Sequence, residues 1–255
     1  MKKTITEREN KEIYVEDDRC FKVFEKGYNV ADILNEAMIQ ARVQETGLMI
    51  PHLLELKVID DRWAIVTRYV EGHTLEELLQ QHPEREEEYL KRFVAIQIDM
   101  QSKRCPLLSK HRDKMNRKIS QTDLSATLRY DLHNRIERMP RHNDLCHGDY
   151  NPSNVIIDEN DDAYIIDWSH ATQGNMEADS ARTFLLFLLE GKKERAARYL
   201  DLYTEMSGCD YKDILNWLPI LAASQSVKGH KDESAFLHRL IFMNRQELEE
   251  LYERV

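Results

Sequence analysis

Three polar residues within 144–168 have the types and spacing that suit a divalent metal ion and a base beside it. Asp149 lies five positions before Asn154, and Asp167 follows thirteen positions later. An amide oxygen and a carboxylate suit Mg²⁺, which keeps several waters and also binds substrate phosphates. A further carboxylate near such an ion suits a base that receives a hydroxyl proton. These residue types therefore indicate a metal-assisted site for a phosphorylated ligand.

A β-hairpin is expected to position the two metal-ligand candidates. The β-branched run 155–157 precedes a polar turn over 158–162, and the apolar run 163–166 ends at Asp167. Two short strands around a polar turn predict a hairpin. Antiparallel pairing would bring the start of one strand beside the end of the other, with facing Cα atoms ~5 Å apart. Asn154 and Asp167 lie at those two ends, so both side chains are expected to reach one ion.

The sequence His147-Gly148-Asp149 with Asn154, followed by Ile165-Ile166-Asp167-Trp168, resembles the motifs of the aminoglycoside phosphotransferase and choline kinase-like family. That family is a branch of the protein-kinase-like fold. The kinase template uses a loop aspartate as base, a following asparagine as metal ligand and a later aspartate as second metal ligand. The resemblance therefore implies ATP and Mg²⁺ as cofactors, Asp149 as the catalytic residue, and Asn154 and Asp167 as the metal ligands.

The resemblance also implies a lysine–glutamate pair early in the chain. The stretch 3–24 is predicted to form three strands, and Lys22 in the third resembles the lysine that binds the α- and β-phosphates. Alternation predicts that Lys22 lies on the opposite sheet face from its two aromatic neighbours. Apolar residues at helical spacing predict a helix over 28–46. Glu36, near its middle, resembles the glutamate that orients the lysine.

Two further strands are expected over 48–59 and 62–70, after which the pattern changes to a helix at Thr74. In the resembled family this change marks the hinge between the lobes, where backbone groups recognise adenine. On that basis the carbonyl of Arg68 and the amide of Val70 are the predicted adenine contacts.

The loop between the first two strands, 7–11, contains no glycine. Glycine lets backbone amides approach phosphates closely. Phosphate binding is therefore expected to depend more on Lys22 and Mg²⁺, with a contribution from Arg8, Asn10 or Lys11. This loop is also the sequence feature that supports an alternative, a catalytically silent nucleotide- or ligand-binding module.

The order of elements predicts an α+β, two-lobed protein-kinase-like fold. A small mixed lobe over 1–70 would bind the nucleotide. A larger, mostly helical lobe over 71–255 would carry the catalytic loop, the metal-binding hairpin and the acceptor site. In the resembled family an aspartate placed like Asp179 anchors the catalytic loop through backbone contacts.

The C-terminal helices over 192–255 would build the acceptor pocket. Four aromatic or acidic residues there are candidates to line it: Tyr203, Asp210, Trp217 and Glu233. Such residues would suit a polar or cationic alcohol, although core packing is the more common role for any one of them.

Charge, hydropathy and cysteine content make a nucleic-acid-binding, membrane-spanning or secreted protein unexpected. The net charge is −10, which makes a nucleic-acid partner unexpected. No apolar run approaches the ~18 residues that span a bilayer, and the charged N-terminus does not resemble a signal peptide. The four scattered cysteines suggest free thiols in a reducing compartment. A cytoplasmic protein without a membrane partner is therefore expected, and the sequence does not indicate its oligomeric state.

The predicted function is transfer of the γ-phosphoryl group of ATP, rather than GTP, to a hydroxyl of a small molecule. An aminoglycoside, a choline-like amine, an amino alcohol and a sugar all remain possible acceptors. A protein kinase is disfavoured because the segment after Asp167 is short and no Ala-Pro-Glu follows. A metal hydrolase using His142, His147 and Asp149 is disfavoured because no helical His-x-x-x-His or Cys-x-x-Cys supports it.

Overall fold

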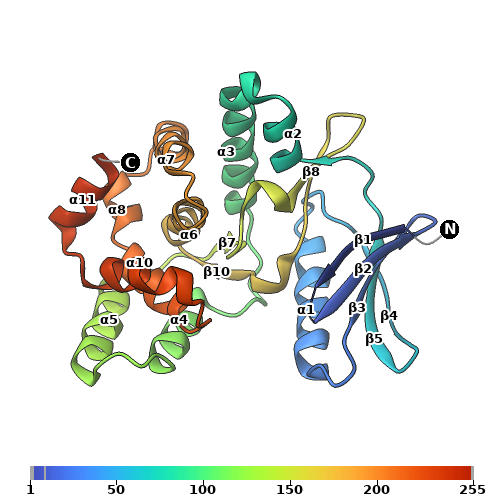
Figure 1. The fold of residues 1–255 in the computed structure, drawn as a ribbon, viewed down its shortest axis with the longest axis horizontal. Helices are drawn as coiled ribbons and strands as arrows, with labels where there is room; N and C mark the ends of the chain where they lie inside the picture. The colour runs from blue at the N-terminus through green and yellow to red at the C-terminus, as the bar shows by residue number, and fades with distance from the viewer. Residues whose placement is uncertain (1–2, 9, 254–255) are drawn as a thin grey trace. The chain divides into compact units, whose positions relative to one another are not determined.

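The computed structural model describes residues 3–8 and 10–253, with only the backbone described for 6–8. Its residues form two compact units, drawn in Figure 1. The first comprises Met1–Pro83 and Pro152–His170, and the second comprises Glu84–Asn151 and Ala171–Val255. The hairpin predicted to carry the metal ligands therefore groups with the first unit, although it was expected within 71–255. The predicted division into lobes at residue 70 stays a prediction.

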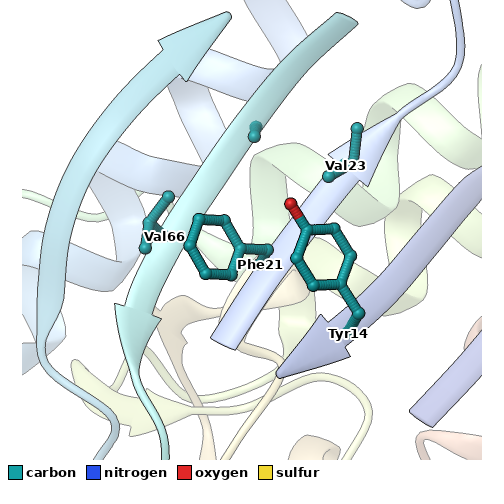
Figure 2. Close-up of a cluster of buried hydrophobic side chains, with 5 residues drawn as sticks. Tyr14, Phe21, Val23 and Val66 are labelled. Carbon is teal, nitrogen blue, oxygen red and sulfur yellow. The ribbon is translucent and has the colours of Figure 1, made fainter. Parts of the chain in front are cut away.

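The first unit is built on a five-stranded antiparallel sheet of order β1-β2-β3-β5-β4. Its strands are β1 (Lys3–Arg8), β2 (Lys11–Glu16), β3 (Arg19–Phe24), β4 (Leu53–Ile59) and β5 (Arg62–Arg68). On one face, Phe21 stacks on Tyr14 at 4.8 Å between ring centroids and is paired in register with Val66 (Figure 2). β4 begins at Leu53 rather than at residue 48, and Pro51, which has no N–H for a strand ladder, lies just before it.

Helix α1 (Val30–Gln44) packs against the opposite face, where Ile33 and Ala37 join Phe24 and Ile65 in one buried cluster. The side chain of Asn29 caps the helix by accepting a hydrogen bond from the Ala31 N–H at 3.0 Å. The predicted helix over 28–46 is thus confirmed with slightly shorter ends.

Lys22 lies on the α1 side of the sheet. The prediction that it faces away from both aromatic neighbours is wrong for Phe24, whose ring centroid is 5.9 Å from the Lys22 Nζ. Phe24 is two positions from Lys22, so strand alternation puts both on the same face. The prediction holds for Phe21, which belongs to the cluster on the other face.

A second, three-stranded sheet completes the first unit. It has the order β6-β8-β9 and contains β6 (His73–Thr74), β8 (Val155–Ile157) and β9 (Ala163–Ile165). Val155 pairs with Ile165, which confirms the predicted hairpin. Helix α2 (Leu75–Gln81) starts where expected, because Thr74 and Glu77 form a reciprocal capping box. Short 3-10 turns η1 (Pro83–Arg85), η2 (Pro152–Asn154) and η3 (Trp168–His170) connect these elements.

Gly72 allows the chain before β6 to approach β8. A Cβ atom at this position would lie 2.2 Å from the carbonyl oxygen of Ile157, which belongs to the backbone and cannot swing away. Gly72→Ala should therefore lower the free energy of unfolding by about 1–3 kcal/mol, as overpacked sites do. Urea denaturation would measure the change, with Glu71→Ala at the exposed neighbouring position as the control. Equal stability of the two variants would show that the backbone at Gly72 does not pack closely against Ile157.

The second unit is mostly helical. Its helices are α3 (Glu86–Ser102), α4 (His111–Ser120), α5 (Ala126–Arg138), α6 (Met176–Leu189), α7 (Lys193–Ser207), α8 (Tyr211–Leu215), α9 (Leu218–Ser226), α10 (Lys231–Phe242) and α11 (Arg245–Glu253). The short strands β7 (Asp144–Cys146) and β10 (Thr172–Gly174) pair antiparallel. Helix α6 is buried along nearly its whole length and packs against α7 and α9.

Apolar residues at helical spacing predict one helical stretch over roughly 108–139, but the structure divides it into α4 and α5. The hydroxyl of Ser125 accepts a hydrogen bond from the Leu128 N–H at 3.3 Å and begins α5 anew. None of the helices in the described ranges 3–8 and 10–253 has the length and apolar character needed to cross a membrane.

Candidate active site

Asp179, on α6, anchors the loop that carries Asp149 within the second unit. Gly148 has φ of +78° and donates its N–H to the Oδ1 of Asp179 at 2.7 Å. The other carboxylate oxygen of Asp179 accepts from Gln101 Nε2 at 3.1 Å. Asp179 is only 2% exposed, so both of these hydrogen bonds are shielded from water. The predicted contact between Asp179 and the catalytic-loop backbone is confirmed.

Tyr150 fixes the chain on the other side of Asp149. Its hydroxyl donates to the carbonyl of Phe93 at 2.8 Å, and its own carbonyl accepts from the Thr183 hydroxyl at 2.8 Å. The rings of Tyr150 and Phe93 stack with centroids 4.4 Å apart. The side chain of Asp149 remains 29% exposed between these buried neighbours. Asp149 is therefore held by a rigid backbone while its carboxylate reaches solvent.

A buried arginine lies beside this carboxylate. The Nη2 of Arg182, on α6, is 3.6 Å from the Oδ1 of Asp149. Burial lowers the pKa of Arg182, and the negative charge of Asp149 opposes that effect. Arg182 was not identified from the sequence, because a helical arginine gives no local sign of the loop that it faces.

A cavity of about 470 Å³ lies within the first unit. Residues from the five-stranded sheet, α1, the segment after β5 and the hairpin line it. It contains every predicted nucleotide and metal residue: Lys22, Glu36, Arg68, Val70, Asn154 and Asp167. The seventh predicted site residue, Asp149, belongs to the second unit.

Lys22 is paired with two carboxylates at this cavity. It forms an ion pair with Glu36, and its Nζ donates to the Oδ1 of Asp167 at 3.2 Å. Burial favours the neutral amine, but the carboxylates of Asp167 and Glu36 outweigh it and raise the pKa of Lys22. The lysine therefore stays charged, as a phosphate-binding group must. The contact predicted between Lys22 and Glu36 is present, while their roles toward ATP stay predictions.

The hairpin brings Asn154 and Asp167 to adjacent positions. The Ile166 N–H donates to the Asn154 carbonyl at 2.9 Å. This bond continues the hairpin's hydrogen-bond ladder beyond β8 and β9, and Asp167 is the next residue after Ile166. Asp167 has φ of +59°, and its Oδ1 accepts from the Ser169 hydroxyl at 3.2 Å. Both residues line the one cavity and offer an amide oxygen and a carboxylate. This donor set fits Mg²⁺.

The alternative set of metal ligands is not assembled. His147 is fully buried, and His142 instead lies 3.7 Å from Asp144 and 3.8 Å from Glu177. Within the described part of the chain, no group of three His, Cys, Asp or Glu side chains could hold a metal ion. The geometry therefore gives no support to the hydrolase alternative.

Two backbone hydrogen bonds hold the end of β5 and the segment that follows it. The Arg68 N–H donates to the His52 carbonyl, and the Tyr69 N–H donates to the Asp18 carbonyl, each at 2.8 Å. Arg68, Tyr69 and Val70 all line the cavity. The backbone contacts of Arg68 and Val70 with adenine stay predictions.

Lys11 is the member of the glycine-free loop that reaches the cavity. In β2, Ile13 is paired with Lys22, and Lys11 lies two positions earlier on the same face. Burial and the nearby positive charge of Lys22 lower the pKa of Lys11. The side chain of Arg8 lies outside the described residues, and Asn10 is exposed.

Most of the acceptor-lining candidates have structural roles. Tyr203 and Trp217 are buried, with the Tyr203 hydroxyl on Gln101 at 2.7 Å and the Trp217 ring against His111. Asp210 caps α8 by accepting from the Lys212 N–H. Tyr203 and Trp217 are therefore core residues, the role expected to be the more common one, and a pocket role for Asp210 stays a prediction. Glu233 alone among the four lies near Arg182, through Gln225.

Comparison with known proteins identifies the fold. A structure of a thermostable mutant of the aminoglycoside phosphotransferase APH(4)-Ia, a ternary complex with ADP and hygromycin B, matches with a TM-score of 0.68 and 17% identity. The match covers 99% of this chain and 93% of that chain. The streptomycin–ATP complex of APH(2")-IIa matches with a TM-score of 0.62 and 13% identity, covering 97% and 93%.

A choline/ethanolamine kinase family protein from Mesorhizobium loti also matches, with a TM-score of 0.58 and 15% identity over 100% of this chain and 86% of that one. These similarities confirm the predicted kinase-like fold, with a small antiparallel-sheet lobe and a mostly helical lobe. No curated protein matches the sequence. The model of the phosphotransferase enzyme family (APH) matches residues 4–218. Because this match covers far more than half of the 255 residues, the chain belongs to the phosphotransferase enzyme family.

Proposed function

We propose that the protein transfers the γ-phosphoryl group of ATP to a hydroxyl group of a small molecule. One observation carries the proposal: a single cavity gathers the Lys22–Glu36 pair, the segment after β5, and both Asn154 and Asp167. Phosphoryl transfer needs a cation for the phosphates, a metal site and a place for the base of the nucleotide. Related folds bound to ADP with hygromycin B, or to ATP with streptomycin, support the same donor and a small-molecule acceptor.

Five polar or charged residues of the cavity each have a part in the proposed reaction. Lys22 binds the nucleotide phosphates, and Glu36 keeps the lysine directed toward them. Asn154 and Asp167 would hold Mg²⁺, which neutralises phosphate charge when bound. Lys11 adds a second cation where the glycine-free loop lacks close backbone contacts.

Asp149 orients the acceptor hydroxyl and receives its proton. The buried contacts of Gly148 and Tyr150 fix the backbone around it before the substrate arrives. Catalysis of this kind depends on positioning and electrostatics more than on covalent chemistry. We expect a cytoplasmic enzyme, which agrees with four cysteines that are all free thiols.

ADP release in the presence of ATP, Mg²⁺ and a panel of alcohols tests the proposal. The panel would contain aminoglycosides, choline-like amines, amino alcohols, sugars, hydroxy acids and sugar phosphates. Acceptor-dependent ADP release is the expected result. The catalytically silent alternative predicts nucleotide binding without turnover on any acceptor.

Lys11→Met should raise the KM for ATP about tenfold while changing kcat little. The reason is the loss of a charge-assisted contact with phosphate, worth about 1.5–3 kcal/mol, and a factor of ten corresponds to about 1.4 kcal/mol. Initial rates over a range of ATP concentrations would measure the effect. Lys26→Met is the matched control, since Lys26 is exposed and paired only at the surface with Asp61. An unchanged KM in Lys11→Met would remove Lys11 from phosphate binding.

A further inference from the structure

A basic cluster within the second unit includes Arg182, which lies 3.6 Å from Asp149. It consists of Lys114 and Lys118 on α4, Arg182 on α6, and Lys228 just after α9. Lys114 and Lys118 are four residues apart and so lie on one face of α4. Helices α4 and α6 both pack against α9, which brings the three segments together.

The members of the basic cluster are close enough to affect one another. Lys114 experiences the positive charges of the other three members and the negative charge of Asp149. Lys228 experiences the positive charges of Arg182 and Lys118 and the negative charges of Asp149 and Glu233. Burial, followed by the positive charge of Arg182, lowers the pKa of Lys114 to about 8. Four cations and the carboxylates of Asp149 and Glu233 therefore affect one another here, so basic groups outnumber these acidic ones although the whole chain carries a net charge of −10.

Carboxylates near the cluster are already engaged. Asp149 lies 3.6 Å from Arg182, and Asp179 is bonded to Gly148 and Gln101. Glu233 accepts from Gln225 Nε2 at 2.7 Å, and the Oε1 of Gln225 accepts from Arg182 Nη1 at 2.9 Å. Lys114 and Lys228 both interact electrostatically with Asp149, so they add positive charge near its 29% exposed side chain.

We propose that the acceptor alcohol carries an oxyanion group, a carboxylate or a phosphate, which the basic cluster binds while Asp149 faces the hydroxyl. This inference rests on the proposed function, because it takes Asp149 as the residue that receives the acceptor. Cationic side chains bind such groups through charge-assisted hydrogen bonds and repel amines. The acceptor class is therefore a hydroxy acid or a sugar phosphate, in place of the polar or cationic alcohol expected from the sequence.

The reaction balances with such an acceptor. The hydroxyl oxygen forms a bond to the γ-phosphorus of ATP, and the bond from that phosphorus to the bridging oxygen breaks. ADP leaves with the electron pair, and the hydroxyl proton passes to Asp149. The oxyanion group of the acceptor takes no part in bond making and serves only for binding.

Matched acceptors test the inference. Glycerol, glycerate and glycerol phosphate share one skeleton and differ in charge, as do a neutral sugar, its amino derivative and its phosphate. We expect kcat/KM at least about tenfold higher for the anionic members, since one charge-assisted contact is worth about that factor. Preference for the carboxylate or for the phosphate then identifies the group. Faster turnover of neutral or amino acceptors would overturn the inference while leaving phosphoryl transfer intact.

Variants of the cluster give a second test. Lys114→Gln and Lys228→Gln should each raise the KM for the anionic acceptor about tenfold and leave the KM for ATP unchanged. Arg117→Gln is the control, because Arg117 is an exposed cation on the same helix. Lys228 is itself exposed, so its substitution tests the cluster without disturbing the core. An equal change of the acceptor KM in all three variants would overturn the inference and leave the proposed function intact. Absence of ADP release with every acceptor would contradict the proposed function itself.

The pH profile gives a third readout. Lys114, with its pKa of about 8, is charged below that pH and neutral above it. For an anionic acceptor, kcat/KM should therefore fall as the pH rises through about 8, and it should not do so for a neutral acceptor. Lys118, Arg182, Lys228, Asp149 and Glu233 face the same region. Only Lys114→Gln should remove the fall, and its persistence in that variant would contradict the assignment.

Discussion

Asp149→Asn should lower kcat by about 10²- to 10⁴-fold, the range that a positioned general base contributes. The amide keeps the shape of the side chain but cannot accept the hydroxyl proton. ATP affinity should stay nearly unchanged, because the nucleotide cavity is lined entirely by residues of the first unit. ADP release would measure kcat, and isothermal titration with ATP would measure binding.

The matched control for this variant is Asp131→Asn. Asp131 is an exposed carboxylate paired with Arg135 on the surface of α5, and such pairs contribute little. Asp149→Asn also removes a charge 3.6 Å from Arg182, so its unfolding should be compared by thermal denaturation. Full activity in a well-folded Asp149→Asn would exclude Asp149 as the base.

Asp167→Asn should lower kcat by about 10²- to 10³-fold, the range that an electrostatic group acting on developing charge contributes. The substitution removes a proposed metal ligand and also a charge 3.2 Å from Lys22. The Mg²⁺ concentration needed for half-maximal activity should rise as well. Glu36 would still pair with Lys22, so the protein should remain folded.

Ser169→Ala is the informative comparison for Asp167→Asn. It removes only the hydroxyl that donates to the Asp167 Oδ1 at 3.2 Å and leaves the carboxylate in place. Its effect on kcat and on the Mg²⁺ requirement should be much smaller. Similar effects of the two variants would mean that the local turn, rather than the carboxylate, governs activity.

Local sequence patterns predicted the elements that carry the candidate site. Asn29 and Thr74 cap α1 and α2, and these helices begin within two residues of their predicted starts at 28 and 74. The two apolar runs around 158–162 form the predicted hairpin because short β-branched or apolar runs and polar turn residues act over a few positions. The pairing of Lys22 with Glu36, 14 positions apart, came from resemblance to the kinase motif and not from spacing alone.

The features that could not be predicted from the sequence depend mostly on packing between residues far apart in the chain. The sequence could not decide between core and pocket for Trp217 and Tyr203, because each packs in the core against a residue far away in the chain. Lys114 and Arg182 meet near Asp149 only because α4 and α6 share α9 as a neighbour. The break between α4 and α5 was missed because apolar periodicity continues across it, although Ser125 offered a capping signal.

The most direct test of phosphoryl transfer is ³¹P NMR of the protein with ATP, Mg²⁺ and the acceptor panel. The proposed function predicts a new phosphomonoester resonance that grows in step with ADP, and its loss in Asp149→Asn. Binding of ATP by the folded protein, with no phosphoester formed from any acceptor, would contradict it.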